Sequence, residues 1–174
     1  TVPTYALISE SFQNWKGMED SGVRRIKREI RIDVRSIAFV TPELLDSISV
    51  RTHVAKWLSE NNEDIEGLRN GGTTSLTNLG AFRAYMVEYL RNHPHIDSMM
   101  PVMVRDMPPT ESGMPVEIYC FSKINSWVPF ESVQSSVVDF AYAVAGQFGL
   151  KLFQSPSGTD LEALRSVTNQ NHKI

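Results

Sequence analysis

The chain has 174 residues, of which 41% are hydrophobic and 21% charged, a composition typical of a globular protein with one sizeable core. Its net charge of −3 at pH 7 disfavours a dedicated nucleic-acid-binding protein, which normally carries net positive charge. The single cysteine, Cys120, excludes an internal disulfide and a cysteine-based zinc site. The start of the chain does not resemble a signal peptide, and it begins at Thr1, which suggests a piece of a longer protein.

The first predicted element is a strand that begins at Arg24. Apolar and charged residues alternate along it with the period of two expected of a half-buried strand. The apolar set is Ile26, Ile30, Ile32 and Val34, interrupted by Arg28, and the opposite set is Arg25, Lys27, Glu29, Arg31 and Asp33. The segment SIAFV (36–40) either extends this strand or starts a separate short element.

Cations are concentrated in this strand. A basic strip of six falls within twelve residues: Arg24, Arg25, Lys27, Arg28, Arg31 and Arg35. Such a strip fits a nucleic-acid patch, a membrane-facing patch, or the solvated face of an ordinary strand. The interleaved acids Glu29 and Asp33 favour the solvated strand face.

A helix is predicted to start at TPE (41–43), where Thr41 can cap the free amides and Pro42 suits the first helical position. Its imperfect apolar face comprises Leu44, Leu45, Ile48, Val54, Trp57 and Leu58. The acidic segment ENNEDIE (60–66) and the segment RNGGTTS (69–75) predict a loop or hairpin insertion near 60–80.

The clearest helix of the chain follows Thr77 and Asn78 and ends at HPH (93–95). Its apolar stripe recurs at i, i+3, i+4, i+7 and i+8: Phe82, Tyr85, Met86, Tyr89 and Leu90.

The second half of the chain predicts a hairpin, a helix and a last strand. MPVMVRDM and PVEIYCF read as paired strands. A third helix starts near Pro129 and stops at Gly149, and LKLFQ (150–154) forms a short strand before a polar tail. The order strand, helix, helix, strand, strand, helix, strand predicts an α+β fold with a ferredoxin-like split β-α-β arrangement.

No catalytic or metal-binding constellation can be argued from spacing. His93 and His95 flank a proline without further ligands nearby, and Cys120 lies in an apolar strand, where a buried thiol is usually inert. The glycines of NGGTTSLTNLG fit neither a P-loop nor a dinucleotide fingerprint. We therefore expect no enzymatic activity, no catalytic residue, no metal and no cofactor.

An RNA-binding function is the alternative from a different class. Ferredoxin-like domains bind RNA when aromatic residues on the open sheet face stack on bases, a role open to Tyr119 and Phe121. The lysine/arginine–glycine–aromatic signature of such domains is absent, and the cations lie on the first strand. A soluble module that binds RNA or a small regulatory ligand therefore ranks second, and no nucleic acid is expected as a partner.

Several segments together resemble one family. PTYALISESFQNWKGMEDSGVRRIKREIRIDVRSI (3–37), LTNLGAFRAYMVEYLRNHP (76–94), PVEIYCF (115–121) and FGLKLFQSPSG (148–158) are similar to small-conductance-type mechanosensitive channels. The resemblance is to the miniconductance subgroup of that bacterial family, and it covers nearly the whole chain. Pro3, Leu7 and Ile8 match the family segment at the end of its β domain.

The resemblance implies the cytoplasmic vestibule domain of a membrane-tension-gated ion channel that protects cells against hypo-osmotic shock. It implies a homo-oligomer, a heptamer in the full-length protein, which passes ions and lies in the bacterial inner membrane with this portion on the cytoplasmic side. Membrane helices, the pore-lining helix and most of the β domain are missing from this chain, so the fragment cannot conduct ions.

The resemblance also divides the chain. Residues 1–23 correspond to the end of the β domain and a junction, 24–158 to the α/β domain with the insertion near 60–80, and 159–174 to a polar tail. We expect Phe12 and Trp15 to anchor the junction. Arg24, Arg25 and Lys27 are expected to line a subunit interface or the vestibule.

Overall fold

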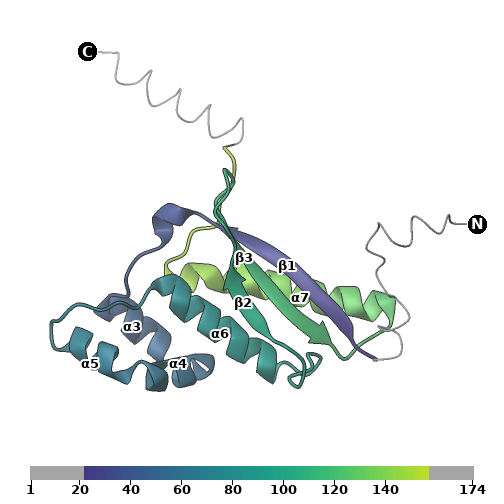
Figure 1. Ribbon diagram of the computed structural model, residues 1–174, viewed down its shortest axis with the longest axis horizontal. Helices are drawn as coiled ribbons and strands as arrows, with labels where there is room; N and C mark the ends of the chain where they lie inside the picture. The colour runs from purple at the N-terminus through teal and green to yellow at the C-terminus, as the bar shows by residue number, and fades with distance from the viewer. Residues whose placement is uncertain (1–21, 157–174) are drawn as a thin grey trace, which may run out of the picture.

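The computed structural model describes residues 22–156 and shows helices and a three-stranded sheet (Figure 1). The elements are β1 (Arg24–Ile32), η1 (Val34–Ser36), α3 (Pro42–Ser49), η2 (Thr52–Val54), α4 (Ala55–Glu60), α5 (Asn62–Arg69), α6 (Asn78–Asn92), β2 (Met103–Asp106), β3 (Met114–Ser122), α7 (Trp127–Ala145) and η3 (Gly146–Phe148). The predicted α+β class is confirmed. The ends of the chain, 1–21 and 157–174, lie outside the described residues, and with them Phe12 and Trp15.

The sheet has the strand order β1-β3-β2, and both pairs are antiparallel. Strand β3 thus lies between β1 and β2, which is the split β-α-β arrangement that the order of elements predicts. The predicted strand at 150–154 forms only an isolated bridge between Leu152 and Ile32. Hydrogen bonds from Asp33 N–H to the Lys151 carbonyl and from Phe153 N–H to the Arg31 carbonyl, both 2.8 Å, hold this segment beside the end of β1. The fourth strand of the fold is therefore reduced to one point of pairing.

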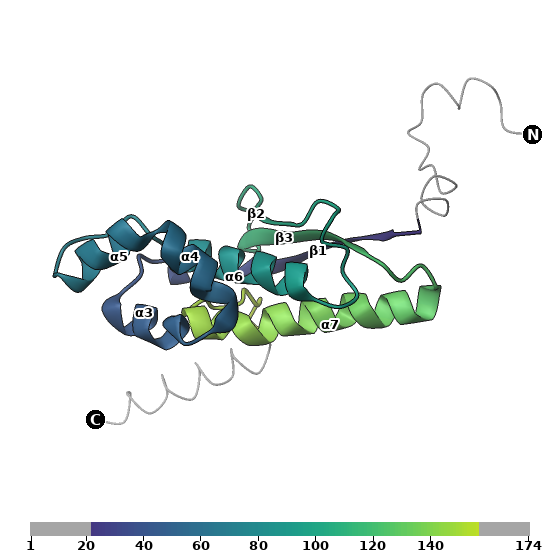
Figure 2. The same ribbon diagram turned by 90° about the horizontal axis from the view of Figure 1, so that it is seen from below.

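Helices α6 and α7 cover the same face of the sheet (Figure 2). The core lies between them and the even-numbered side chains of β1 and β3, among them the fully buried Ile26, Ile30 and Ile118. The opposite face of the sheet is not covered by a helix within residues 22–156. The alternation predicted for β1 is thus confirmed up to Ile32, whereas Val34 falls in η1 and is 46% exposed.

The helix predicted from Thr41 begins there but ends at Ser49, well before the last predicted apolar positions. The Thr41 side chain accepts a hydrogen bond from Leu44 N–H and Pro42 occupies the first helical position, so the predicted cap is confirmed. The chain then leaves the helix at Val50, which is 85% exposed, and resumes as η2 and α4. The break follows because the β-branched residues in VRT (50–52) favour helix weakly, and it lets Val54 and Trp57 reach the core.

The predicted loop or hairpin at 60–66 is wrong, because residues 62–69 form helix α5. Its only buried residues are Ile65 and Leu68, one helical turn apart. Two apolar positions in an acidic segment give too little periodicity to recognise a helix, and tertiary packing decides the structure here. The loop prediction is correct for the following stretch, 70–77, where Gly71 has a φ of +83°.

The remaining predicted helices and the hairpin are confirmed. Helix α6 starts at its Thr77 cap and ends at Asn92, directly before HPH. Strands β2 and β3 pair as predicted, and Gly149 ends η3, which follows α7, with a φ of +71°. Within the described residues, no helix combines the length and the apolar character needed to cross a bilayer.

Candidate interaction surface

The pairing of β1 with β3 places the basic strip beside aromatic side chains. Arg25 lies opposite Phe121, and Lys27 lies opposite Tyr119, on the face of the sheet away from α6 and α7. On the other side of β3, Met103 of β2 lies opposite Tyr119. We call the outward side chains of these three strands the open face: Arg25, Lys27, Glu29, Arg31, Met103, Arg105, Pro115, Glu117, Tyr119 and Phe121.

A buried carboxylate lies at the centre of the open face. Glu117 is only 4% exposed, because cations from both neighbouring strands fold over it. Arg105 donates to its Oε1 from Nη2 at 2.6 Å and from Nε at 2.8 Å, and Lys27 Nζ lies 3.3 Å from its Oε2. Burial by itself raises the pKa of Glu117, but the hydrogen bonds from Arg105 and Lys27 outweigh it, and the pKa lies below the usual 4.5. The carboxylate is therefore ionised and fixes both cations in place.

The cations of the basic strip do not share one surface. The Cζ atom of Arg24 lies 4.3 Å from the centre of the Phe130 ring in α7, a cation–π contact on the side covered by the helices. Arg28 projects to the same side by strand alternation and is exposed. Of the residues predicted to line an interface or vestibule, Arg25 and Lys27 lie together on the open face and Arg24 is separated from them.

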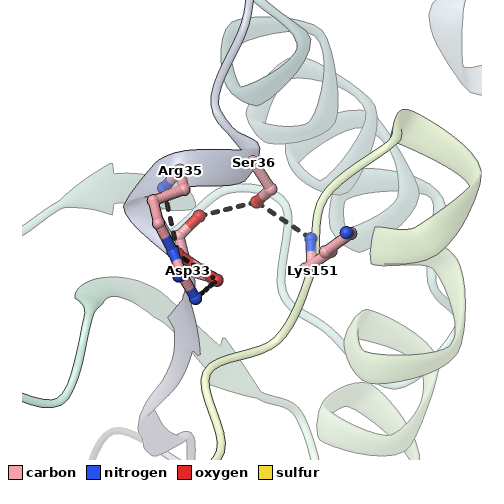
Figure 3. A network of polar contacts seen from close by, with 4 residues as sticks. All are labelled: Asp33, Arg35, Ser36 and Lys151. Carbon is pink, nitrogen blue, oxygen red and sulfur yellow. Dashed lines mark hydrogen bonds and ion pairs between the residues drawn. The ribbon is translucent and has the colours of Figure 1, made fainter. Parts of the chain in front are cut away.

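The last cation of the strip, Arg35, belongs to a network that holds the end of β1 (Figure 3). Its Nη2 donates to Asp33 Oδ2 at 2.7 Å, and its Nε and backbone N–H donate to Oδ1 at 3.0 Å. Ser36 Oγ donates to the Asp33 carbonyl at 2.6 Å and accepts from Lys151 N–H at 2.9 Å. The network thus joins η1 to the segment that pairs with Ile32. The role of Arg35 is to hold Asp33 in this network at the end of β1.

This network predicts an acidic titration for Asp33. Hydrogen bonds from the Arg35 side chain and backbone lower the pKa of Asp33 from 3.8 to about 2. Because the folded pKa is the lower one, this carboxylate stabilises the fold above about pH 4 and the contribution is lost as the pH falls toward 2. In Arg35→Ala we expect the pKa to rise toward 3.8 without reaching it, since the backbone N–H still donates. An NMR titration of the Asp33 carboxyl carbon measures this pKa, with Arg28→Ala as the control variant. An unchanged Asp33 pKa in Arg35→Ala would contradict the role of Arg35.

Burial and a local hydrogen bond describe the surroundings of Cys120 and of the His93–His95 pair. Cys120 is fully buried, and burial raises the pKa of its thiol to about 12, so the thiolate is scarce at neutral pH. His93 Nδ1 accepts a hydrogen bond from His95 N–H at 3.2 Å, and burial, with His95 nearby, lowers the pKa of His93. No group of three His, Cys, Asp or Glu side chains converges on a metal position within residues 22–156.

A groove of about 390 Å³ runs between α4, α6 and β2. Its cations already have partners: Lys56 Nζ lies 3.7 Å from Glu88 Oε1, Arg91 Nη1 lies 3.2 Å from the same atom, and Arg83 Nη1 lies 2.9 Å from Asp106 Oδ2. Since these charges are neutralised within the chain, the groove offers an anionic ligand little gain. On the open face, Lys27 and Arg105 pair with Glu117 and Arg31 pairs with Glu29, but Arg25 forms no ion pair among residues 22–156, so this face is the stronger candidate for interaction.

Sequence reasoning missed Glu117 and Arg105 as members of this surface. Glu117 lies between two apolar residues in β3 and Arg105 follows Val104 in β2, but only the register of β3 with β1 and β2 brings them to one point. The comparison with protein families gives no match: no family model fits the chain.

Proposed function

We propose that this chain is the cytoplasmic vestibule domain of a membrane-tension-gated ion channel that protects bacteria against hypo-osmotic shock. In this proposal the domain is not an enzyme and binds no cofactor. It forms a homo-oligomer, a heptamer in the full-length protein, around a path for permeating ions. Membrane attachment is supplied by helices that precede Thr1 in the full-length protein, which lies in the inner membrane with this domain on the cytoplasmic side.

The observation that carries the proposal is the resemblance of segments spread from Pro3 to Gly158 to the miniconductance subgroup of mechanosensitive channels. The strand-helix-strand-strand-helix order with β3 inserted between β1 and β2 is compatible with the α/β domain that this resemblance implies. The open face adds a surface with more cations than anions, which would raise the local concentration of anions along an ion path.

The most direct test is the coding sequence upstream of Thr1. Several apolar runs of about 20 residues each would supply the missing membrane helices. An initiator codon directly before Thr1, without such runs, would refute the channel proposal. Light scattering of the purified chain adds a second measurement, since seven copies of 19.6 kDa form a ring of about 137 kDa.

The basic open face predicts an effect on ion selectivity. In the full-length channel, Arg25→Glu/Lys27→Glu changes the charge of each subunit by four units on one surface. We expect a lower anion-to-cation permeability ratio, because the electrostatic potential along the ion path becomes negative. Reversal potentials in excised patches under a KCl gradient measure this ratio.

A control reverses one charge, a change of two units or half that of the double variant, on the other side of β1. Arg28→Glu lies on the same strand, is exposed, and projects to the side covered by the helices. It should leave the reversal potential near that of the unmodified channel. Equal reversal potentials in all three proteins would refute an ion path along the open face.

A further inference from the structure

The open face carries a pair of aromatic side chains on the central strand of the sheet. Tyr119 and Phe121 of β3 are both half-buried, with ring centres 5.5 Å apart and planes at 82°. Met103 on β2 flanks Tyr119 and is 36% exposed. Within residues 22–156 no helix packs on this face of the sheet, because α6 and α7 lie on the opposite face (Figures 1 and 2).

The spacing of these rings suits the bases of an extended single strand. Residues two apart in a strand are separated by about 6.8 Å along it and project from the same face. A single strand of nucleic acid can unstack its bases and place successive ones on neighbouring aromatic rings. The near-perpendicular ring planes require the two bases to be splayed apart, which unpaired nucleotides permit.

The charges around the rings suit a polyanion. The open face holds four cations, Arg25, Lys27, Arg31 and Arg105, and two anions, Glu29 and Glu117. It is therefore positive although the whole chain has a net charge of −3. Arg31 pairs with Glu29 and Arg105 with Glu117. Arg25 forms no ion pair among residues 22–156, and the side chain of Lys27 stays 54% exposed despite its contact with Glu117. Arg25 and Lys27 of β1 lie directly opposite Phe121 and Tyr119 in the neighbouring strand β3.

We propose that the open face binds single-stranded RNA, with bases stacked on Tyr119 and Phe121 and phosphates beside Arg25 and Lys27. RNA is preferred to DNA because the Glu29 carboxylate lies on the same face: its Oε1 accepts from Arg31 Nη2 at 3.0 Å, and its Oε2 can accept a hydrogen bond from a ribose 2′-hydroxyl. An acidic protein segment fits this surface less well, because it would pair with the cations but leave the faces of the aromatic rings unused. This inference reverses the expectation from the sequence that no nucleic acid is a partner. It does not rest on the channel proposal, and either can fail without the other.

The test is fluorescence anisotropy of a fluorescein-labelled uridine 12-mer with the full chain. Two phosphate contacts predict a salt slope of about −1.4, or a roughly sevenfold weaker affinity at 200 mM than at 50 mM KCl. Tyr119→Ala and Phe121→Ala should each weaken binding at least about fivefold, because each removes one stacking platform. No binding at 50 mM KCl, or binding that both aromatic variants leave unchanged, overturns the proposal.

Matched controls separate the open face from general electrostatics. Arg25→Ala should weaken binding, whereas Arg28→Ala on the opposite side of β1 should not, and Tyr142→Ala on α7 controls for the loss of an exposed aromatic ring. Arg25 is exposed, so its variant decides the outcome even if Tyr119→Ala fails to fold. Equal losses in Arg25→Ala and Arg28→Ala overturn the assignment to the open face. Equal affinity for the deoxyuridine 12-mer overturns the preference for RNA.

Discussion

Gly113→Ala is expected to destabilise the fold by about 2–5 kcal/mol, the sum of left-handed backbone strain and overpacking. Gly113 has a φ of +84° in the connection between β2 and β3. A Cβ atom there would lie 2.5 Å from the Ile32 carbonyl oxygen and 2.9 Å from Phe153 Cβ. The close approach exists because the end of β1, the hairpin connection and the 151–153 segment meet at this point. The Ile32 carbonyl and the Cα that carries Phe153 Cβ are held by the pairing of the 151–153 segment with β1, so neither neighbour can move without breaking that pairing.

Gly71→Ala is the matched control for this variant. Gly71 has almost the same φ, +83°, but an added Cβ would meet no heavy atom within 4 Å. It should cost only the backbone strain, about 1–2 kcal/mol. Urea unfolding followed by circular dichroism gives both free energies of unfolding. Equal losses in the two variants would mean that crowding against the Ile32 carbonyl and Phe153 adds no cost to the backbone strain.

Asn78→Ala is expected to cost about 2–4 kcal/mol, because it leaves buried backbone groups without partners. Asn78 is 3% exposed at the start of α6. Its Oδ1 accepts from Ala38 N–H at 3.0 Å and from Leu79 N–H at 2.9 Å, and its Nδ2 donates to the Ser36 carbonyl at 2.9 Å. The Asn78 side chain thus joins the segment after β1 to α6, the longest helix between β1 and β2. Thermal and urea unfolding measure the loss.

Two further variants isolate the hydrogen bonds of Asn78. Asn92→Ala removes an exposed amide from the other end of α6 and should cost less than about 0.5 kcal/mol. Asn78→Asp keeps the acceptor, and its carboxyl can donate to the Ser36 carbonyl only when protonated. The ionised carboxylate keeps the hydrogen bonds from Ala38 and Leu79 N–H but leaves the Ser36 carbonyl without its donor, so Asn78→Asp should still cost stability at pH 7. A free energy of unfolding at pH 7 equal to that of the unmodified protein would refute the role of the Ser36 bond.

Local signals in the sequence were sufficient for much of the fold. The helix that begins at Thr77 carries a complete apolar stripe, and the start at Thr41 combines a cap with a following proline, so each element is specified within a few residues. The same holds for β1, where alternating isoleucines identify the buried face without knowledge of its partner. These predictions succeeded because burial and capping act at the spacing of one helical turn or one strand repeat.

Tertiary contacts decided the elements with weak local signals. Helix α5 has only Ile65 and Leu68 to bury, and the sequence around them is acidic and polar. The segment LKLFQ has the composition of a strand, but the chain pairs with β1 only at Leu152 and its two neighbouring hydrogen bonds. In both cases the number of contacts available from the rest of the core determined the structure, and no window of sequence contains that information.

The same distinction applies to the candidate surface. The sequence by itself determined its ingredients: a strand with cations on its outward side, and a second strand with Tyr119 and Phe121 two residues apart. Only the antiparallel register between β1 and β3 decided that Arg25 and Lys27 lie opposite those rings, while Arg24 turns to Phe130. Likewise, three strands together bury Glu117 beneath Lys27 and Arg105. Side-chain alternation is a property of one strand, whereas register is a property of a pair, set by the packing of both strands on α6 and α7.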